Sequence, residues 1–403
     1  MLNSKYRKRL FGGVSALSLV IGQLQPTFAA VPVPLAPNDG NTATPIKHVI
    51  IIVGENRTFD QVFGTYTPQS GQTVNNLLSE GIVNADGTAG PNFSKAVQNQ
   101  ATDTDTYRNA PTTTGPYATL PPPTTGSLAT APSDTKGPPF ASLAFAEQAD
   151  YGLFPQDLRL LLTGATGLPA KSIDTRIANV KALPSGPFPL VSSTGDSLYD
   201  AYLESPVHRF YQMWQQLDCS ASHVTAGNPS GCLADLFPWV EVTVGAGSNG
   251  AAQATNFTDQ TTGEGSTSMG FFNVAKGDMP FFKQLADQYA ISDNYHQPVM
   301  GGTGANSIMI GAADAYYYTD GKGNATTPPA GQIENPNPQP GTNNFYAQDG
   351  YGTAGSGGGS YTNCSDTSQP GVAPVVTYLQ SLPNQPAANC APGHFYLLNN
   401  YNP

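Results

Sequence analysis

The chain has 403 residues and a formal net charge of −11 at pH 7. This length is enough for one large domain, or for a domain with a cap. A net negative surface repels the phosphates of nucleic acids and anionic lipids, so neither is expected as a non-specific partner. After the first 29 residues, no apolar stretch is long enough to span a bilayer.

The first 29 residues have the pattern of an export signal. A short apolar run, Leu10–Gly22, follows four basic residues, and Thr27–Ala29 supplies small residues for cleavage. Removal of this segment would take the net charge from −11 to about −15. We therefore predict a signal peptide over 1–29, a domain over 30–403 and a periplasmic or secreted location. An uncleaved membrane anchor is the less favoured alternative.

The next stretch, Ile46–Gly64, opens with the apolar run Val49–Val53. Its β-branched residues and the lack of polar alternation predict a strand buried on both faces of a parallel sheet. Glu55 and Asn56 follow this strand, at the end where ligands bind in open α/β sheets. Their oxygens suit a hard cation. Considered alone, the pair is more typical of a solvated turn after a core strand.

Three long segments are rich in Gly, Ser, Thr, Pro and Asn, and we predict loop-rich insertions there. They lie near 99–138, 244–268 and 318–372. The composition of the first segment predicts a surface excursion that contributes nothing to a core. The third segment is expected to form part of a cap over the site, because long loops inside a domain often have such functions.

Two segments have apolar residues at helical spacing, which predicts helices that pack on the core. His208 lies in the first turn of the first helix, where a histidine is often only a surface residue. The stripes consist of Phe210, Met213, Trp214 and Leu217 in the first helix and of Phe281, Phe282, Leu285 and Tyr289 in the second.

A glycine-rich turn surrounds Thr303, with Gly301 and Gly302 before it and Gly304 after it. Such a turn can present the Thr303 hydroxyl to a substrate. The segment that follows, 307–313, can continue as a helix, whose first amides and dipole favour a phosphate. From composition alone, an ordinary glycine-rich turn is the favoured interpretation.

The chain contains four cysteines, which in an exported protein indicate two disulfides. Three connectivities are possible, and we favour pairing between sequence neighbours. The absence of a CxxC motif argues against zinc-thiolate and redox sites. The predicted pairs are Cys219 with Cys232 and Cys364 with Cys390.

Two stretches resemble the bacterial phosphoesterase family of phospholipases C and acid phosphatases. The first is VGENRTFDQVFG, from Val53 to Gly64, which is similar to the family's N-terminal signature. The second is LADQYAISDNYH, from Leu285 to His296, followed by Gly302-Thr303-x-x-Asn306. The resemblance implies the α/β fold of the alkaline-phosphatase superfamily, with a mostly parallel sheet between helices and loop-rich insertions that form a cap.

The resemblance also implies roles for individual residues. Glu55, Asn56 and Thr303 would bind the catalytic metal, and Thr303 would be the nucleophile that is phosphorylated. His208 lies in a His-Arg-Phe context like one found near the phosphate, and Asn306 takes the place of the family's Asn in Pro-Asn-Arg, although Ala305 and Ser307 flank it here. His296 is a further candidate for substrate binding, and a structural role in its turn is the alternative.

These expectations combine into an exported hydrolase that cleaves phosphate mono- or diesters through a phosphothreonine, with a divalent metal ion whose identity is open. Its partner would be a small phosphate ester or a phospholipid headgroup. In the family, a strand similar to 395–399 leads to an Asp pair and a histidine that are not found here, so we expect the sequence to be part of a longer enzyme. The alternative is a secreted protein that binds phosphate or a headgroup without catalysis.

Overall fold

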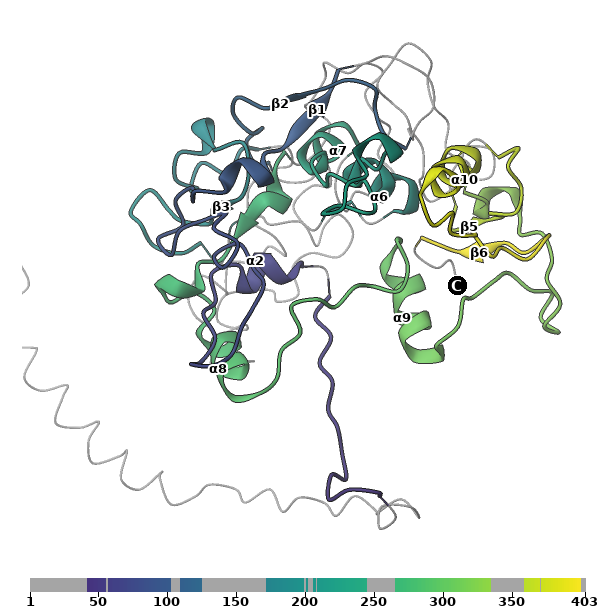
Figure 1. The fold of residues 1–403 in the computed structure, drawn as a ribbon, viewed down its shortest axis with the longest axis horizontal. Coiled ribbons are helices and arrows are strands. Elements are labelled where there is room, and N and C mark those ends of the chain that lie inside the picture. The colour runs from purple at the N-terminus through teal and green to yellow at the C-terminus, as the bar shows by residue number, and fades with distance from the viewer. Residues whose placement is uncertain are drawn as a thin grey trace, which may run out of the picture. The chain divides into compact units, whose positions relative to one another are not determined.

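The structure is a computed structural model (Figure 1). It describes residues 42–55, 57–102, 109–124, 172–198, 201, 206–207, 209–244, 265–334, 359–369 and 371–399. The predicted signal peptide lies outside this part of the chain. Residues up to Val53 form a unit that is separate from the one beginning at Gly54, and the two are described separately.

The described elements are six helices, six short strands and several 3₁₀ turns. The helices are α2 (Phe59–Phe63), α6 (Phe210–Leu217), α7 (Phe237–Val244), α8 (Pro280–Gln288), α9 (Thr303–Ala312) and α10 (Val372–Ser381). The strands are β1 (Asn99–Ala101), β2 (Thr114–Pro116), β3 (Phe188–Pro189), β4 (Gly270–Phe271), β5 (Tyr361–Thr362) and β6 (Tyr396–Leu397).

These strands form three two-stranded sheets. The pairs β1–β2 and β5–β6 are antiparallel, and β3–β4 is parallel, with Phe188 opposite Gly270. The described residues therefore combine helices with short strands, and they include no extended parallel sheet. The prediction of a mostly parallel sheet is not supported by this part of the chain.

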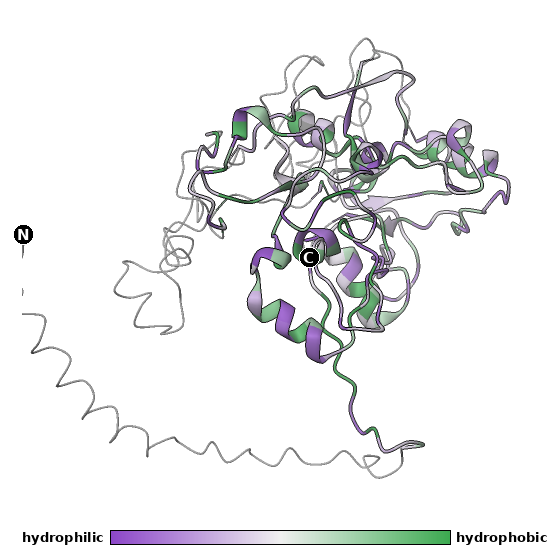
Figure 2. Cartoon of the chain, turned by 60° about the vertical axis from the view of Figure 1, so that its left-hand side comes forward, coloured by the Kyte–Doolittle hydropathy of each residue, from purple (hydrophilic) through white to green (hydrophobic). Residues whose placement is uncertain are grey.

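The apolar run Val49–Val53 shows why that prediction fails. It adopts no strand, and the exposed fractions of its side chains range from 41% at Val53 to 87% at Ile50. Figure 2 gives this run the colour of hydrophobic residues. A β-branched run is suited to a sheet, but only a hydrogen-bonding neighbour makes it a strand. No such neighbour is found among the described residues.

The largest core cluster combines α6, α7 and the segments around β2 and β3. Trp239 and Tyr211 belong to it and are almost completely buried, and Figure 1 shows α6 and α7 side by side. Tyr117 and Leu120 also belong to it and are buried. The prediction that 99–138 contributes nothing to a core is thus wrong for its described part. Average composition concealed two large apolar side chains next to β2.

Helix α6 buries a different face from the predicted one. Its most buried residues are Tyr211, Gln212, Gln215 and Gln216, whereas the predicted stripe is only half-buried. The amide Nε2 of Gln216 donates to the carbonyl oxygens of Val207 (2.5 Å) and Gln212 (3.2 Å). These bonds help glutamines to occupy a buried face, because a buried polar group is costly only when it is left without a partner.

The stripe on α8 is also placed differently from the prediction. The exposed fractions of Phe281 and Tyr289 are 64% and 68%, and Phe282 is exposed as well. Phe282 makes an edge contact with Phe63 of α2, with 6.5 Å between the ring centroids. Helical spacing identified the apolar face correctly, but the described residues leave most of it uncovered.

Both predicted disulfides are confirmed. Cys219 pairs with Cys232, and Cys364 pairs with Cys390. The two bridges close sequence separations of 13 and 26 residues. Their presence is consistent with an oxidising location outside the cytoplasm.

A buried carboxyl near the first disulfide predicts a pH dependence of stability. Burial raises the pKa of Asp235, although hydrogen bonds with Asn99 and Asp218 lower it in part. The folded protein therefore binds this proton more tightly than the unfolded chain does. Its stabilising effect is complete below the unfolded pKa of about 3.9 and is lost as pH rises through the raised folded pKa.

Replacement of Asp235 by Asn tests this dependence, because the amide imitates the protonated acid. Between about pH 4 and pH 7, we expect the free energy of unfolding to fall less steeply in Asp235→Asn than in the unaltered protein. Urea unfolding at several pH values measures both slopes. Equal slopes would show that the Asp235 carboxyl is not responsible.

Candidate functional site

The residues after Glu55 build the short helix α2. Thr58 caps it: the Gln61 backbone N–H donates to Thr58 Oγ1 (3.2 Å), and the Thr58 N–H donates to Gln61 Oε1 (2.9 Å). A Cβ at Gly64 would lie 2.4 Å from the carbonyl oxygen of Asp60, so only glycine fits there. Much of the signature after Glu55 is therefore needed to fold the chain locally.

Helix α2 is also fixed to distant parts of the chain. Asp60 Oδ1 accepts a hydrogen bond from the Leu77 N–H at 3.1 Å, and burial raises the pKa of Asp60 while this bond lowers it. The side-chain Nε2 of Gln61 donates to the Ser268 carbonyl at 3.0 Å. The backbone carbonyl of Gln61 accepts from the Phe272 N–H at 2.9 Å. These contacts hold α2, and with it the chain that leaves Glu55.

A helix is present where the sequence predicts one over 307–313, but α9 begins four residues earlier, with Thr303 as its first residue. In the turn before it, the Gly301 N–H donates to the Val299 carbonyl (2.9 Å), and the Gly302 N–H donates to the Leu398 carbonyl (3.1 Å). A Cβ at Gly301 would lie 1.5 Å from that Leu398 oxygen. The glycines thus let the turn approach the end of β6, and the Thr303 side chain remains exposed.

Asn306 is bonded to the turn itself. Its Oδ1 accepts from the Val299 N–H at 3.0 Å, and its Nδ2 donates to the carbonyls of Gly301 (3.2 Å) and Gly302 (3.1 Å). Both ends of the amide are therefore occupied by the backbone that presents Thr303. This arrangement favours a positioning role for Asn306 over the predicted contact with substrate.

Glu55 and Thr303 lie together although they are 248 positions apart in the sequence. Thr303 Oγ1 donates a hydrogen bond of 2.7 Å to Glu55 Oε1. Both side chains are exposed, so the hydroxyl and the carboxylate are open to solvent and to a ligand. The structure thus brings together two of the three residues predicted to bind a metal.

The described part of the structure does not connect the remaining predicted site residues to the Glu55–Thr303 pair. Asn56 and His208 lie outside the described residues. His296 is exposed, and its Nε2 is hydrogen-bonded to Asn294 Oδ1 at 2.8 Å. No described contact joins His296 to Thr303, so its predicted role in substrate binding stays a prediction.

The oxygen atoms of Glu55 and Thr303 suit a hard divalent cation, because carboxylate and hydroxyl oxygens are the ligands that such ions prefer. Within the described residues, no three His, Cys, Asp or Glu side chains gather in an arrangement that could hold a metal ion. The candidate site is therefore defined by the Glu55–Thr303 pair and not by a complete cluster of acids.

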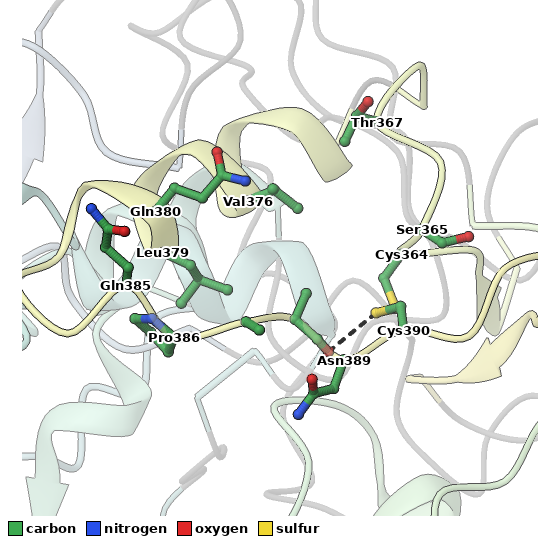
Figure 3. Close-up of a pocket in the computed structure, with 12 residues that line it drawn as sticks. Cys364, Ser365, Thr367, Val376, Leu379, Gln380, Gln385, Pro386, Asn389 and Cys390 are labelled. Carbon is green, nitrogen blue, oxygen red and sulfur yellow. Dashed lines mark hydrogen bonds between the residues drawn. A yellow bond between two sulfur atoms is a disulfide. The ribbon is translucent and has the colours of Figure 1, made fainter.

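A separate pocket of about 410 Å³ lies beside α10 and the second disulfide (Figure 3). Its lining includes the side chains of Gln380, Gln385 and Asn389, and none of the described residues that line it is charged. An anionic phosphate needs positive charge or a metal, so this pocket does not suit it. It also contains none of the predicted site residues.

The end of β6 contributes to this site in a way that no sequence motif indicates. Leu398 contacts the turn before Thr303 through its backbone, which no side-chain motif reveals. The position of Asn399 and Asn400 could have suggested a role near the site. Both follow an apolar strand, at the end where α/β proteins bind ligands.

Comparisons with known proteins gave one match. A family model described as the Phosphoesterase family matches residues 46–119 and 155–400. Neither the curated proteins nor the solved structures include a match. None of the helices that the structure describes has the length and apolar character needed to cross a bilayer.

Proposed function

This chain belongs to the phosphoesterase family, membership of which implies hydrolysis of phosphate esters, and from this premise we propose an exported, metal-dependent phosphoesterase with Thr303 as its nucleophile. The observation that carries the proposal is the 2.7 Å hydrogen bond from Thr303 Oγ1 to Glu55 Oε1. It joins a hydroxyl to a basic oxygen at the start of a helix, where developing negative charge is favoured.

In the proposed reaction, Thr303 Oγ1 forms a bond to phosphorus, and the bond between phosphorus and the leaving alcohol breaks. The hydroxyl proton passes to Glu55, which already accepts its hydrogen bond. Glu55 then returns this proton to the leaving alcohol. Water cleaves the phosphothreonine and restores the Thr303 hydroxyl, which releases phosphate from a monoester substrate or a phosphate monoester from a diester substrate.

Glu55, Asn56 and Thr303 would hold the divalent ion, which supplies Lewis-acid stabilisation of negative charge on the nucleophile and the phosphate. The chain's own part is to keep these oxygens together. The bonds of Asn306 hold the turn at Thr303, and α2 holds the chain that leaves Glu55.

Glu55→Gln tests the carboxylate. We expect the rate of ester hydrolysis to fall by about a hundredfold or more, because the amide neither accepts the proton nor neutralises a cation. The apparent affinity for the activating metal should fall with it. Hydrolysis of para-nitrophenyl phosphate and of bis(para-nitrophenyl) phosphate, titrated with Mg²⁺, Mn²⁺, Ca²⁺ and Zn²⁺, measures both effects.

Glu80→Gln is the matched control, since Glu80 is an exposed carboxylate that no described contact links to the site. Equal activity in Glu55→Gln and in the unaltered chain would contradict the proposed role. Metal-dependent binding of inorganic phosphate without turnover of either ester would instead favour a secreted, non-catalytic binding protein. The preferred ester distinguishes a monoesterase from an enzyme that acts on phospholipid-type diesters.

A further inference from the structure

Asn399, directly after β6, is buried, with an exposed fraction of 6%. Its Oδ1 accepts a hydrogen bond from the Phe210 N–H, the first residue of α6, at 2.8 Å. Its Nδ2 donates to Glu334 Oε2 at 2.8 Å and to the Gly359 carbonyl at 3.0 Å. The acceptor and both donors of this one amide are thus bonded to three separate segments.

The preceding residue, Leu398, bonds to a fourth segment. Its carbonyl oxygen accepts from the Gly302 N–H at 3.1 Å, next to Thr303, and its own N–H donates to the Ser360 carbonyl at 2.9 Å. The end of β6 therefore lies beside both α6 and α9 (Figure 1). A shift of Asn399 must move the carbonyl that holds the turn before the nucleophile.

Glu334 makes this arrangement rigid. Its side chain is buried, and its Oε2 accepts from the Asn399 amide and, at 3.4 Å, from the Gly359 N–H. Hydrogen bonds to a carboxylate are stronger than those between neutral groups, and burial strengthens them further. A buried carboxylate that already accepts two N–H groups also strongly disfavours a second negative charge beside it.

We propose that Asn399, held by Glu334, is a positioning residue that sets the place of the Thr303 turn relative to the start of α6. The inference rests on the proposed function, since it assigns Asn399 to the same site. Asn399 acts through the Leu398 carbonyl and does not contact the substrate. Displacement of a nucleophile by about 1 Å can lower the rate by about a hundredfold, so the placement matters for turnover.

Asn399→Asp is the decisive variant. It keeps the size of the side chain and the acceptor for Phe210, but it places a carboxylate oxygen against Glu334 Oε2. We expect kcat for para-nitrophenyl phosphate to fall about 10- to 100-fold with little change in KM. We also expect faster hydrogen exchange at the amides of Gly302 and Phe210. Adding Glu334→Gln, which faces the new carboxylate with an amide donor, should restore part of both properties.

Asn273→Asp is the matched control. Asn273 is equally buried, and its side chain accepts from Thr65 Oγ1 (3.0 Å) and donates to the Ala85 carbonyl (3.2 Å), away from the residues assigned to the site. It should lower thermal stability but leave kcat, and the exchange rate of the Gly302 amide, unchanged.

The kinetic and the hydrogen-exchange measurements together distinguish a failure of the inference from a failure of the proposed function. If Asn399→Asp matches Asn273→Asp in kcat, or if the Gly302 amide exchanges equally fast in both, Asn399 is an ordinary buried amide and the inference is wrong. If the unaltered chain hydrolyses neither nitrophenyl ester, the proposed function fails. The exchange rates then still decide whether Asn399 holds the turn at Thr303.

Discussion

Thr303→Ala is expected to lower kcat for phosphate-ester hydrolysis by at least about a thousandfold, because it removes the atom that attacks phosphorus. The Thr303 hydroxyl is exposed and already donates a hydrogen bond to Glu55. It is therefore positioned to lose its proton as it attacks. Substrate affinity should change much less. Thr303→Ser retains a hydroxyl at the start of α9 and is expected to keep measurable activity.

Acid quenching during turnover provides the second readout. Mass spectrometry of the quenched protein should find one phosphate group on Thr303 in the unaltered chain and none in Thr303→Ala. Ser307→Ala is the control, since Ser307 is an exposed hydroxyl on the same helix, and it should keep both activity and phosphorylation. Full activity in Thr303→Ala, or phosphate on another residue, would contradict the mechanism.

Gly301→Ala is expected to lower both the stability and the activity of the protein. The new Cβ would lie 1.5 Å from the Leu398 carbonyl oxygen, so the turn or the end of β6 has to move. Overpacking of this kind costs about 1–3 kcal/mol of stability. Movement of the turn should also lower kcat by about a hundredfold, because Thr303 follows two residues later. Urea unfolding and nitrophenyl phosphate hydrolysis measure the two losses.

Gly311→Ala separates this effect from a general intolerance of alanine. Gly311 lies within α9, and a Cβ there would meet no atom within 4 Å. Alanine in a helix interior is expected to stabilise the fold by about 0.5–1 kcal/mol and to leave activity unchanged. Unchanged stability and activity in Gly301→Ala would show that the close approach to Leu398 is not needed.

Several features of this protein follow from local sequence. Among three possible connectivities, the predicted pairing joins cysteines that are neighbours in the sequence, and the structure confirms both pairs. Local sequence also predicts a helix over 307–313, and the structure has one that begins four residues earlier, at Thr303. The resemblance over Val53–Gly64 and Leu285–Asn306 gave the family, which the family match supports. Each of these depends on residues close together in the chain.

The predictions that failed concern contacts between distant residues. Periodicity marked apolar faces on α6 and α8, but α6 buries glutamines and α8 leaves Phe281 exposed, since a pattern does not state what covers a face. The run Val49–Val53 has strand-forming side chains and no strand partner among the described residues. Side-chain pattern alone cannot supply the hydrogen-bonding neighbour that a strand requires.

The signature around Glu55 and the turn around Thr303 are local patterns, so the sequence alone marks both residues as candidates for the chemistry. Their contact, with an oxygen–oxygen distance of 2.7 Å across 248 positions, arises only in the folded chain. The folded chain also places the Leu398 carbonyl against the Gly302 N–H in the turn, and the Asn399 amide against the start of α6. A hydrogen bond between backbone groups does not depend on which side chain a residue carries, so no sequence motif predicts it.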